Sequence, residues 1–403
     1  MKQFFFECQP WELEREGAEE ALARLAGEIG VDGIHLHVSS SGGAALYPRG
    51  PMGPRIDSCD KGLQFQLDAS KYASVRVRPR IAAWMKSRNP LEAVCKLAER
   101  HRLKVRAALP VSIPMPERST VATIINALGD VSPHSLCFAH PDTQELHAAL
   151  IEDLSSNYPI DVVEIAAPRR PRAQAAYDVL TFPSPSSDGE PFSECLAWCF
   201  CPSCRQQAQA AGVDIALVQK KITDLISSLP AMDAAPREWK DVVAEVAALA
   251  GYERWQDESA RTLVRQLRER CRKSLSLRLE ESRYPVEFAA RHALRTWEGI
   301  SERMSLRAVR GGLPDEPRPV RKLGSALAAV RNESPPMPGE LKIDLLMPSR
   351  PPDVRDGPHL VSLTHEAAQT GCETIVFQDY ATSPDACLDW VRQAIRFARR
   401  ESQ

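Results

Sequence analysis

The sequence predicts an α/β fold in which eight parallel strands close into a (β/α)8 TIM barrel. Short strand candidates alternate with helical segments or long crossovers, the pattern that a parallel sheet requires. Eight such candidates occur along the chain, which is the number that closes this barrel. The length of 403 residues fits one barrel with insertions, so we expect a single domain over residues 1–403. An open doubly wound sheet is the alternative, although no Gly-x-Gly-x-x-Gly motif follows a strand candidate.

The strand candidates are short runs that are apolar or that alternate between apolar and polar residues. In chain order they cover residues 3–8, 31–39, 103–111, 160–167, 285–291, 304–309, 341–347 and 373–379. Helices are expected between them from the 3.6-residue spacing of apolar positions. The first helix, 13–29, ends at Gly30, and another starts at Asn89-Pro90, a cap followed by proline at the first helical position. A further helix opens at Pro141, residues 205–283 are expected to form a helical insertion after strand four, and 385–400 closes the chain.

The composition is typical of a soluble globular protein, with 43% hydrophobic and 26% charged residues and a net charge of −2. This balance argues against a nucleic-acid partner, and no stretch approaches the roughly 18 apolar residues of a membrane span. Only three consecutive apolar residues, Phe4 to Phe6, precede Glu7, so we expect no signal peptide. Eleven cysteines without disulfide-like spacing predict a reducing cytoplasm. Whether the chain forms a homo-oligomer is left open.

The cysteine cluster is the strongest local motif. Cys199, Cys201 and Cys204 are spaced so that their thiolates can converge on one tetrahedral ion, and zinc prefers such ligands. The fourth ligand is either Cys195, just upstream, or Cys137, which follows strand three and would meet the cluster at the carboxyl-terminal rim of a barrel. An all-cysteine site leaves no open position for water, so a zinc ion here would be structural. The alternative is a set of buried thiols without metal.

These segments resemble the zinc-bearing family 42 β-galactosidases, which are TIM-barrel glycoside hydrolases. The resemblance covers about the first 215 residues and depends on Cys137-Phe-Ala-His-Pro141, the strand Asp161 to Ile165 and Cys199-Phe-Cys-Pro-Ser-Cys-Arg205. It implies a structural zinc bound by cysteines beside the active-site rim. It does not supply the catalytic pair, because strand four ends in Ala166-Ala167-Pro168 where those enzymes have Asn-Glu, and no glutamate ends the seventh strand candidate.

In the strand candidates, polar residues occupy alternate positions, so they share one face of each strand. The apolar parity must face the helices, so the polar parity should point into the barrel. Burying unpaired ions costs several kcal/mol each, and these groups must therefore pair or line a wet mouth. The inward set is Glu7, His35, His37, Arg106, Glu164, Glu287, Arg291, Arg307, Asp344, and Gln378 or Asp379.

This inward set predicts a glycoside-hydrolase-like enzyme that acts on a small-molecule or oligosaccharide substrate with carboxylate acid/base chemistry. Glu164 is expected to be the acid, with a pKa raised by its neighbours, and Glu287 or Asp344 its partner. His35 and His37 would orient substrate or transfer protons. Glu7, Arg106, Arg291, Arg307, Gln378 and Asp379 would bind substrate. The alternatives are a carbohydrate-binding pseudo-enzyme that lost the carboxylate pair, and a barrel isomerase or lyase that uses the histidines.

Overall fold

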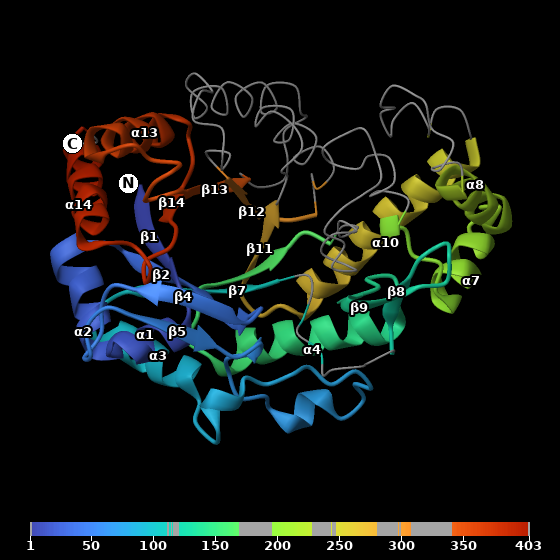
Figure 1. Ribbon diagram of the computed structural model, residues 1–403, viewed down its shortest axis with the longest axis horizontal. Helices are drawn as coiled ribbons and strands as arrows, with labels where there is room; N and C mark the ends of the chain where they lie inside the picture. The colour runs from blue at the N-terminus through green and yellow to red at the C-terminus, as the bar shows by residue number, and fades with distance from the viewer. Residues whose placement is uncertain are drawn as a thin grey trace.

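The computed structural model contains a closed barrel of eight parallel strands (Figure 1). It describes residues 2–110, 113, 115, 121–168, 196–227, 243, 247–279, 297, 300–307 and 341–401. In order around the barrel the strands are β1 (Gln3–Cys8), β2 (Gly33–His37), β7 (Lys104–Leu109), β10 (Val162–Ala166), β11 (Ser274–Leu279), β12 (Arg303–Arg307), β13 (Lys342–Met347) and β14 (Thr374–Phe377). The last strand pairs with the first, with Phe5 opposite Val376. The predicted TIM barrel is confirmed.

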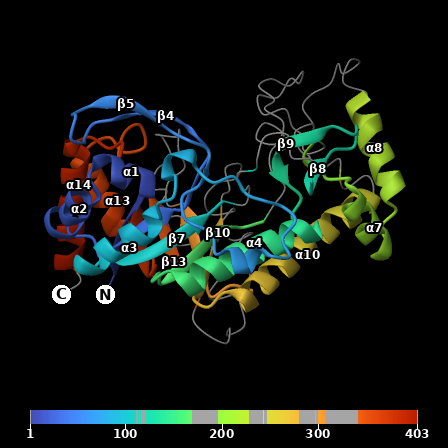
Figure 2. The same cartoon turned by 90° about the horizontal axis from the view of Figure 1, so that it is seen from below.

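Helices surround the barrel on the outside. They are α1 (Pro10–Glu16), α2 (Ala18–Ala23) with the π-helical η1 (Arg24–Ile29), α3 (Pro90–Arg100), α4 (Pro141–Asn157), α10 (Ala247–Arg270), α13 (Gly357–Gln369) and α14 (Asp385–Arg400). Local sequence sets their starts: the Asn89 side chain accepts a hydrogen bond from the Glu92 amide, and Asp356 caps α13 in the same way. Helices α3, α4 and α10 run along one side of the molecule (Figure 2). Among the described residues, no helix combines the length and hydrophobicity needed to cross a membrane.

The expected fifth strand was misplaced. Strand β11, at Ser274–Leu279, lies between β10 and β12 in the barrel, whereas residues 285–291 lie outside the described residues. The side chains of Leu275, Leu277 and Leu279 are buried against the helix layer outside the barrel. Those of Ser276 and Arg278 alternate with them and face the barrel axis. The helical insertion expected over 205–283 therefore ends early, because α10 stops at Arg270 and a period-two pattern begins.

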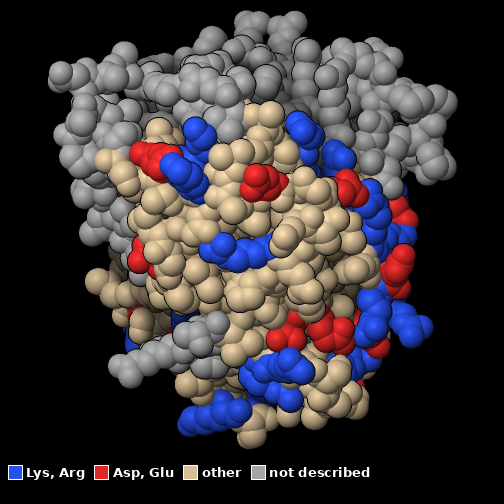
Figure 3. All heavy atoms as spheres, turned by 90° about the vertical axis from the view of Figure 1, so that its right-hand side faces the viewer, with Lys and Arg blue, Asp and Glu red and all other residues tan. Residues whose placement is uncertain are grey.

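A second hydrophobic core lies in an arm to the side of the barrel. The arm contains the hairpin β8 (Thr123–Ile125) and β9 (Val131–Leu136), the helices α7 (Pro202–Ala210) and α8 (Ile215–Ser227), and the start of α10. Its buried residues include Trp198, Phe200, Val218, Ile222 and Tyr252. On the end of the molecule formed by this arm, acidic and basic side chains are scattered among neutral residues (Figure 3).

Additional strands follow β2. The hairpin β4 (Gly43–Tyr47) and β5 (Arg55–Cys59) is antiparallel, and β3 (Ser39–Ser40) pairs with β6 (Gly62–Leu63). Two short 3₁₀ helices, η2 (Ala69–Tyr72) and η3 (Ala83–Met85), lead on to α3. These elements lie between the second barrel strand and its helix, so they are insertions that leave the order of the barrel unchanged.

The main core lies between the strands and the helix layer. Phe4, Phe6, Ile34, Leu36 and Leu277 are buried there. Because side chains alternate along each strand, the opposite parity faces the barrel axis. That parity carries most of the charged residues expected from the sequence, and these residues form the candidate site.

Candidate functional site

Two carboxylates meet on one guanidinium inside the barrel. Arg278 of β11 donates from Nε to Oε1 of Glu164 at 2.7 Å and from Nη2 to Glu7. Glu164 comes from β10 and Glu7 from β1, so three strands supply the group. Arg278 and Glu7 are each 8% exposed and Glu164 is 1% exposed. Both carboxylates contact nitrogens of the same guanidinium, so Arg278 bridges Glu164 and Glu7 by charge-assisted hydrogen bonds.

Two histidines of β2 complete this group, which we call the Arg278 cluster: Glu7, His35, His37, Glu164 and Arg278. The Nε2 of His35 lies 3.1 Å from Glu164, and the Nε2 of His37 lies 2.5 Å from Glu7. His35 is 1% exposed, whereas the side chain of His37 is 28% exposed. His37 is the last residue of β2 and Glu7 its hydrogen-bond partner, so these two lie at the open, carboxyl-terminal end of the cluster.

Two neutral side chains also bind the carboxylates. The Ser305 hydroxyl of β12 donates to Glu164, and Nε2 of Gln378 donates to Oε2 of Glu7 at 3.1 Å. Each carboxylate thus accepts hydrogen bonds from a cation, a histidine and a neutral donor. Such saturation favours the ionised form.

The electrostatics correct the role expected for Glu164. Burial alone would raise its pKa, but Arg278, His35 and the Ser305 hydroxyl together hold the pKa of Glu164 far below its usual value. Burial also acts on Glu7, and His37 and Arg278 hold its pKa well below the usual value in the same way. Both groups are therefore carboxylates at neutral pH, and Glu164 is not a proton donor.

A proton donor is nevertheless present near the mouth. Glu12, partly buried in the first turn of α1, accepts a hydrogen bond from the Gln9 amide at 2.8 Å. Burial, together with the charges of Asp379 and Glu7, raises the pKa of Glu12 to about 7, although the Gln9 hydrogen bond and His37 act in the opposite direction. Sequence reasoning missed Glu12 because its helical position gives no sign that its carboxyl faces the ends of β1, β2 and β14.

Asp344 belongs to a separate group in the barrel. Its oxygens bind Arg303 at 2.6 Å and Arg106 at 3.0 Å, and Arg106 also donates to the Thr374 hydroxyl at 2.8 Å. The Arg106 guanidinium lies 4.2 Å from the centre of the Phe5 ring. Arg303 and Thr374 are the first residues of β12 and β14, and Asp344 lies two positions after Lys342, the first residue of β13. This group therefore fills the amino-terminal half of the barrel. There it forms an internal ion-pair network, away from the Arg278 cluster.

Two of the remaining expected residues, Arg307 and Asp379, lie at the rim. Glu287 and Arg291 lie outside the described residues. Arg307 has the inward parity but is exposed at the end of β12, and Asp379 pairs with Arg350 at 3.3 Å on the rim. Arg278, Arg303 and Ser305 were missed, although the alternation in 274–279 and 303–307 could have revealed them.

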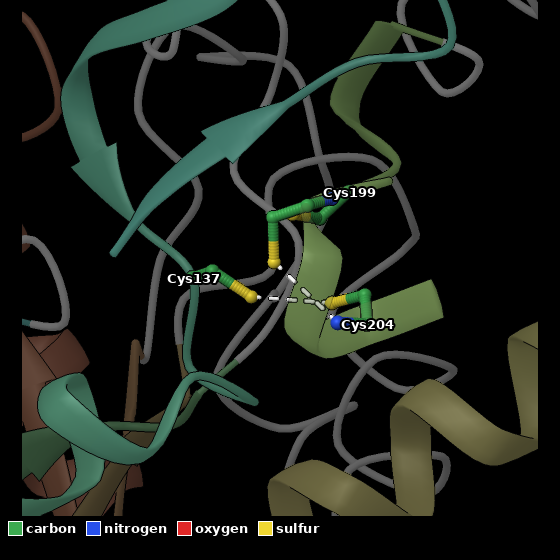
Figure 4. A group of neighbouring side chains, drawn as sticks. Cys137, Cys199 and Cys204 are labelled. Atoms are coloured by element: carbon green, nitrogen blue, oxygen red, sulfur yellow. Dashed lines mark hydrogen bonds between the residues drawn. The ribbon is translucent and has the colours of Figure 1, made fainter. Parts of the chain in front are cut away.

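Four cysteine sulfurs form a second candidate site, the cysteine cage. The Sγ atoms of Cys137, Cys199, Cys201 and Cys204 all lie within 4.8 Å of one another, and all four residues are buried. Figure 4 shows the side chains of Cys137, Cys199 and Cys204 pointing toward one another from the β9–α4 connection and from the start of α7. The alternative ligand Cys195 lies outside the described residues.

The local fold explains why these sulfurs converge. Cys201 caps α7, and its sulfur accepts the Cys204 amide at 3.5 Å; the Cys199 sulfur accepts the Cys201 amide at 3.5 Å. Hairpin β8–β9 delivers Cys137, whose sulfur lies 3.3 Å from that of Cys204. Around a zinc ion with bonds of 2.3 Å, tetrahedral sulfurs are about 3.8 Å apart. The donor set and its spacing therefore fit zinc.

The closed eight-stranded barrel is a TIM barrel, and solved structures with a similar fold include glycoside hydrolases. It is similar to the β-galactosidase from the psychrophilic Marinomonas ef1, with a TM-score of 0.50 and 12% identity over 99% of this chain and 60% of that one. An α-amylase from Malbranchea cinnamomea gives a TM-score of 0.47 at 8% identity, over 99% and 77% of the two chains. D-psicose 3-epimerase from Clostridium cellulolyticum H10 gives 0.41 at 10%, over 99% and 98%.

No protein-family model matches the sequence, and no curated protein matches it either. The chain spans about 60% of the length of the β-galactosidase chain. At 12% identity this similarity shows the fold alone.

Proposed function

We propose that the protein is a glycoside-hydrolase-like enzyme that acts on a carbohydrate at the carboxyl-terminal end of the barrel. The observation that carries this proposal is the pair of ionised carboxylates, Glu7 and Glu164, joined by Arg278. An oxocarbenium-like transition state develops positive charge, which a fixed carboxylate stabilises. Glu7 is the better placed of the two, because it lies beside the partly exposed His37 whereas Glu164 is 1% exposed.

In this proposal each residue of the cluster has one role. Glu7 faces the sugar as nucleophile or base. Glu164, deeper in the barrel, holds Arg278 and His35 in position. Glu12, with a pKa of about 7, donates the proton to the leaving oxygen, since a general acid works best with a pKa near the working pH. His37 and Gln378, both bonded to Glu7, fix the orientation of its carboxylate.

Hydrolysis of a panel of 4-nitrophenyl glycosides tests the proposal. Glu7→Gln should lower turnover by at least about 100-fold while the circular dichroism spectrum stays that of the wild type. Glu302→Gln, which removes a surface partner of Arg268, is the matched control and should retain full activity. Wild-type activity in Glu7→Gln would refute the role of Glu7, and sugar binding without turnover by the wild type would favour the pseudo-enzyme.

A second function is favoured by one observation: neither carboxylate of the cluster holds a proton, and His37 is a partly exposed histidine bound to one of them. A His37–Glu7 pair can move a proton to and from a carbon beside a carbonyl, as an isomerase requires. Incorporation of solvent deuterium into a reducing sugar, absent in His37→Gln, would support this reaction. Release of 4-nitrophenol without deuterium incorporation would support the hydrolase instead.

We also propose that the cysteine cage holds one structural zinc ion. The four thiolates would fill its coordination sphere, so the metal would join hairpin β8–β9 to α7 rather than take part in the reaction. All described cysteines are free of disulfide bonds, in keeping with the reducing cytoplasm in which we place the protein. Metal analysis of protein purified under reducing conditions should give about one zinc per chain, and metal-free protein would refute this assignment.

A further inference from the structure

A small cavity lies against one side of the cysteine cage. Cys137, Cys199 and Cys204 line it on one side, and Trp255 and Gln256 of α10 line it on the other. Gln256 is 3% exposed. Within the described part of the chain, its Oε1 atom is buried and has no hydrogen-bond partner. Leaving a buried amide group without a hydrogen-bond partner is costly. We therefore expect the Gln256 amide to have a partner in this cavity, which the cysteine cage also lines.

Helix α10 is held firmly against the cage. Tyr252, one turn before Gln256 and on the same helix face, donates a hydrogen bond from its hydroxyl to the Cys199 carbonyl. The Tyr252 ring stacks on Phe200, with centroids 5.5 Å apart, and on Trp255 at 5.2 Å. These contacts fix the part of α10 that carries Gln256 in the lining of this cavity.

A zinc ion with four thiolates carries a net charge of −2, and burying that charge requires hydrogen-bond donors. Two donors to the sulfurs are the Cys201 and Cys204 amides. The oxygen and nitrogen of a glutamine amide exchange places when the amide turns by 180°, and the hydrogen-bond partners decide which orientation is correct. Thiolates repel the oxygen and attract the N–H, so a loaded cage favours Nε2 on the cavity side.

We propose that Gln256 donates a hydrogen bond from its side-chain amide to a metal-bound thiolate of the cysteine cage. It is a positioning residue, because it acts on zinc through a cysteine sulfur. The inference depends on the proposed zinc ion and adds to it the residue that ties the metal to α10. Loss of such a donor lowers metal affinity by about 10- to 100-fold in known sites.

Competition for zinc between the full-length protein and a chromogenic chelator tests the inference. Gln256→Leu keeps the size of the side chain and removes its donor, and should weaken zinc binding by about 10- to 100-fold. Gln256→Glu places a negative charge beside the thiolates and should weaken binding further. In cobalt-loaded protein, the sulfur-to-metal charge-transfer absorption should shift in Gln256→Leu, which a change in folding stability alone would not produce.

Gln219→Leu is the matched control, because Gln219 lies in the same arm and donates to the Ala127 carbonyl at 2.8 Å, away from the sulfurs. It should leave zinc affinity unchanged. Zinc affinity of Gln256→Leu within twofold of the wild type, with an unshifted cobalt spectrum, would overturn the role of Gln256 and leave the metal site intact. Failure of the wild type to bind either metal would instead refute the zinc site itself.

Discussion

Replacing Arg278 by methionine should expose the electrostatic basis of the cluster. The guanidinium is the shared cation of Glu164 and Glu7, all of them at most 8% exposed. Removing one partner of a buried ion pair costs about 3–5 kcal/mol, because the remaining charge is left uncompensated. We therefore expect Arg278→Met to lower the free energy of unfolding by about 3–5 kcal/mol at pH 7.

The loss of unfolding free energy in Arg278→Met should be smaller at acid pH. In the wild type the lowered pKa values of Glu7 and Glu164 give stability that is present above the unfolded-state value of 4.5 and lost as pH falls through the folded value. Without Arg278 the main cation that lowers both pKa values is gone while burial still raises them, so the two carboxylates add less stability at neutral pH than in the wild type.

Urea unfolding followed by circular dichroism at pH 7, 5.5 and 4 measures this difference. The gap between wild type and Arg278→Met should narrow by at least about 1 kcal/mol between pH 7 and pH 4. Arg307→Met is the control, since Arg307 is exposed and its loss should change stability by less than about 0.5 kcal/mol. A gap that is equal at all three pH values would refute the reasoning.

Three further changes test the other groups. Asp344→Asn should destabilise the protein by about 3–5 kcal/mol, since it leaves the buried Arg106 and Arg303 without their shared carboxylate; thermal melting measures this, and an unchanged melting temperature would contradict the ion-pair network. Glu12→Gln should remove the limb of the pH–rate profile near pH 7. It should also remove the loss of stability between pH 4.5 and 7 that the raised pKa of Glu12 causes. A pH–rate profile identical to that of the wild type would exclude Glu12 as the acid. Cys201→Ser should abolish stoichiometric zinc by metal analysis and lower the melting temperature, and retention of one zinc per chain would show that Cys201 is not a ligand.

The barrel could be predicted from the sequence because its strands keep a strict alternation that only one orientation satisfies. His35 and His37 alternate with Ile34 and Leu36, and the structure buries the aliphatic pair against the helices. Strand β11 was not predicted because only three residues separate its first residue from the end of a long helix that is rich in arginine. The predicted helical insertion over 205–283 includes Arg278, so the sequence does not place its side chain inside the barrel.

The error in β11 carried over to the chemistry. With Arg278 absent from the expected site, the neighbours of Glu164 were expected to raise its pKa, whereas the Arg278 guanidinium lowers it. The cysteine spacing predicted a cluster, because three ligands lie on one turn. The choice of the fourth was open, since the approach of Cys137 depends on hairpin β8–β9, whose pairing of Thr123 with Leu136 joins segments that carry no metal motif.

The ionisation of Glu7 and Glu164 can be measured directly from the carbon-13 shifts of their side-chain carboxyls. If Arg278 holds both groups as carboxylates inside the barrel, their shifts will stay at the ionised position from pH 8 down to pH 4, and will titrate at higher pH in Arg278→Met. A wild-type midpoint at or above 4.5 for either group would contradict this account of the site.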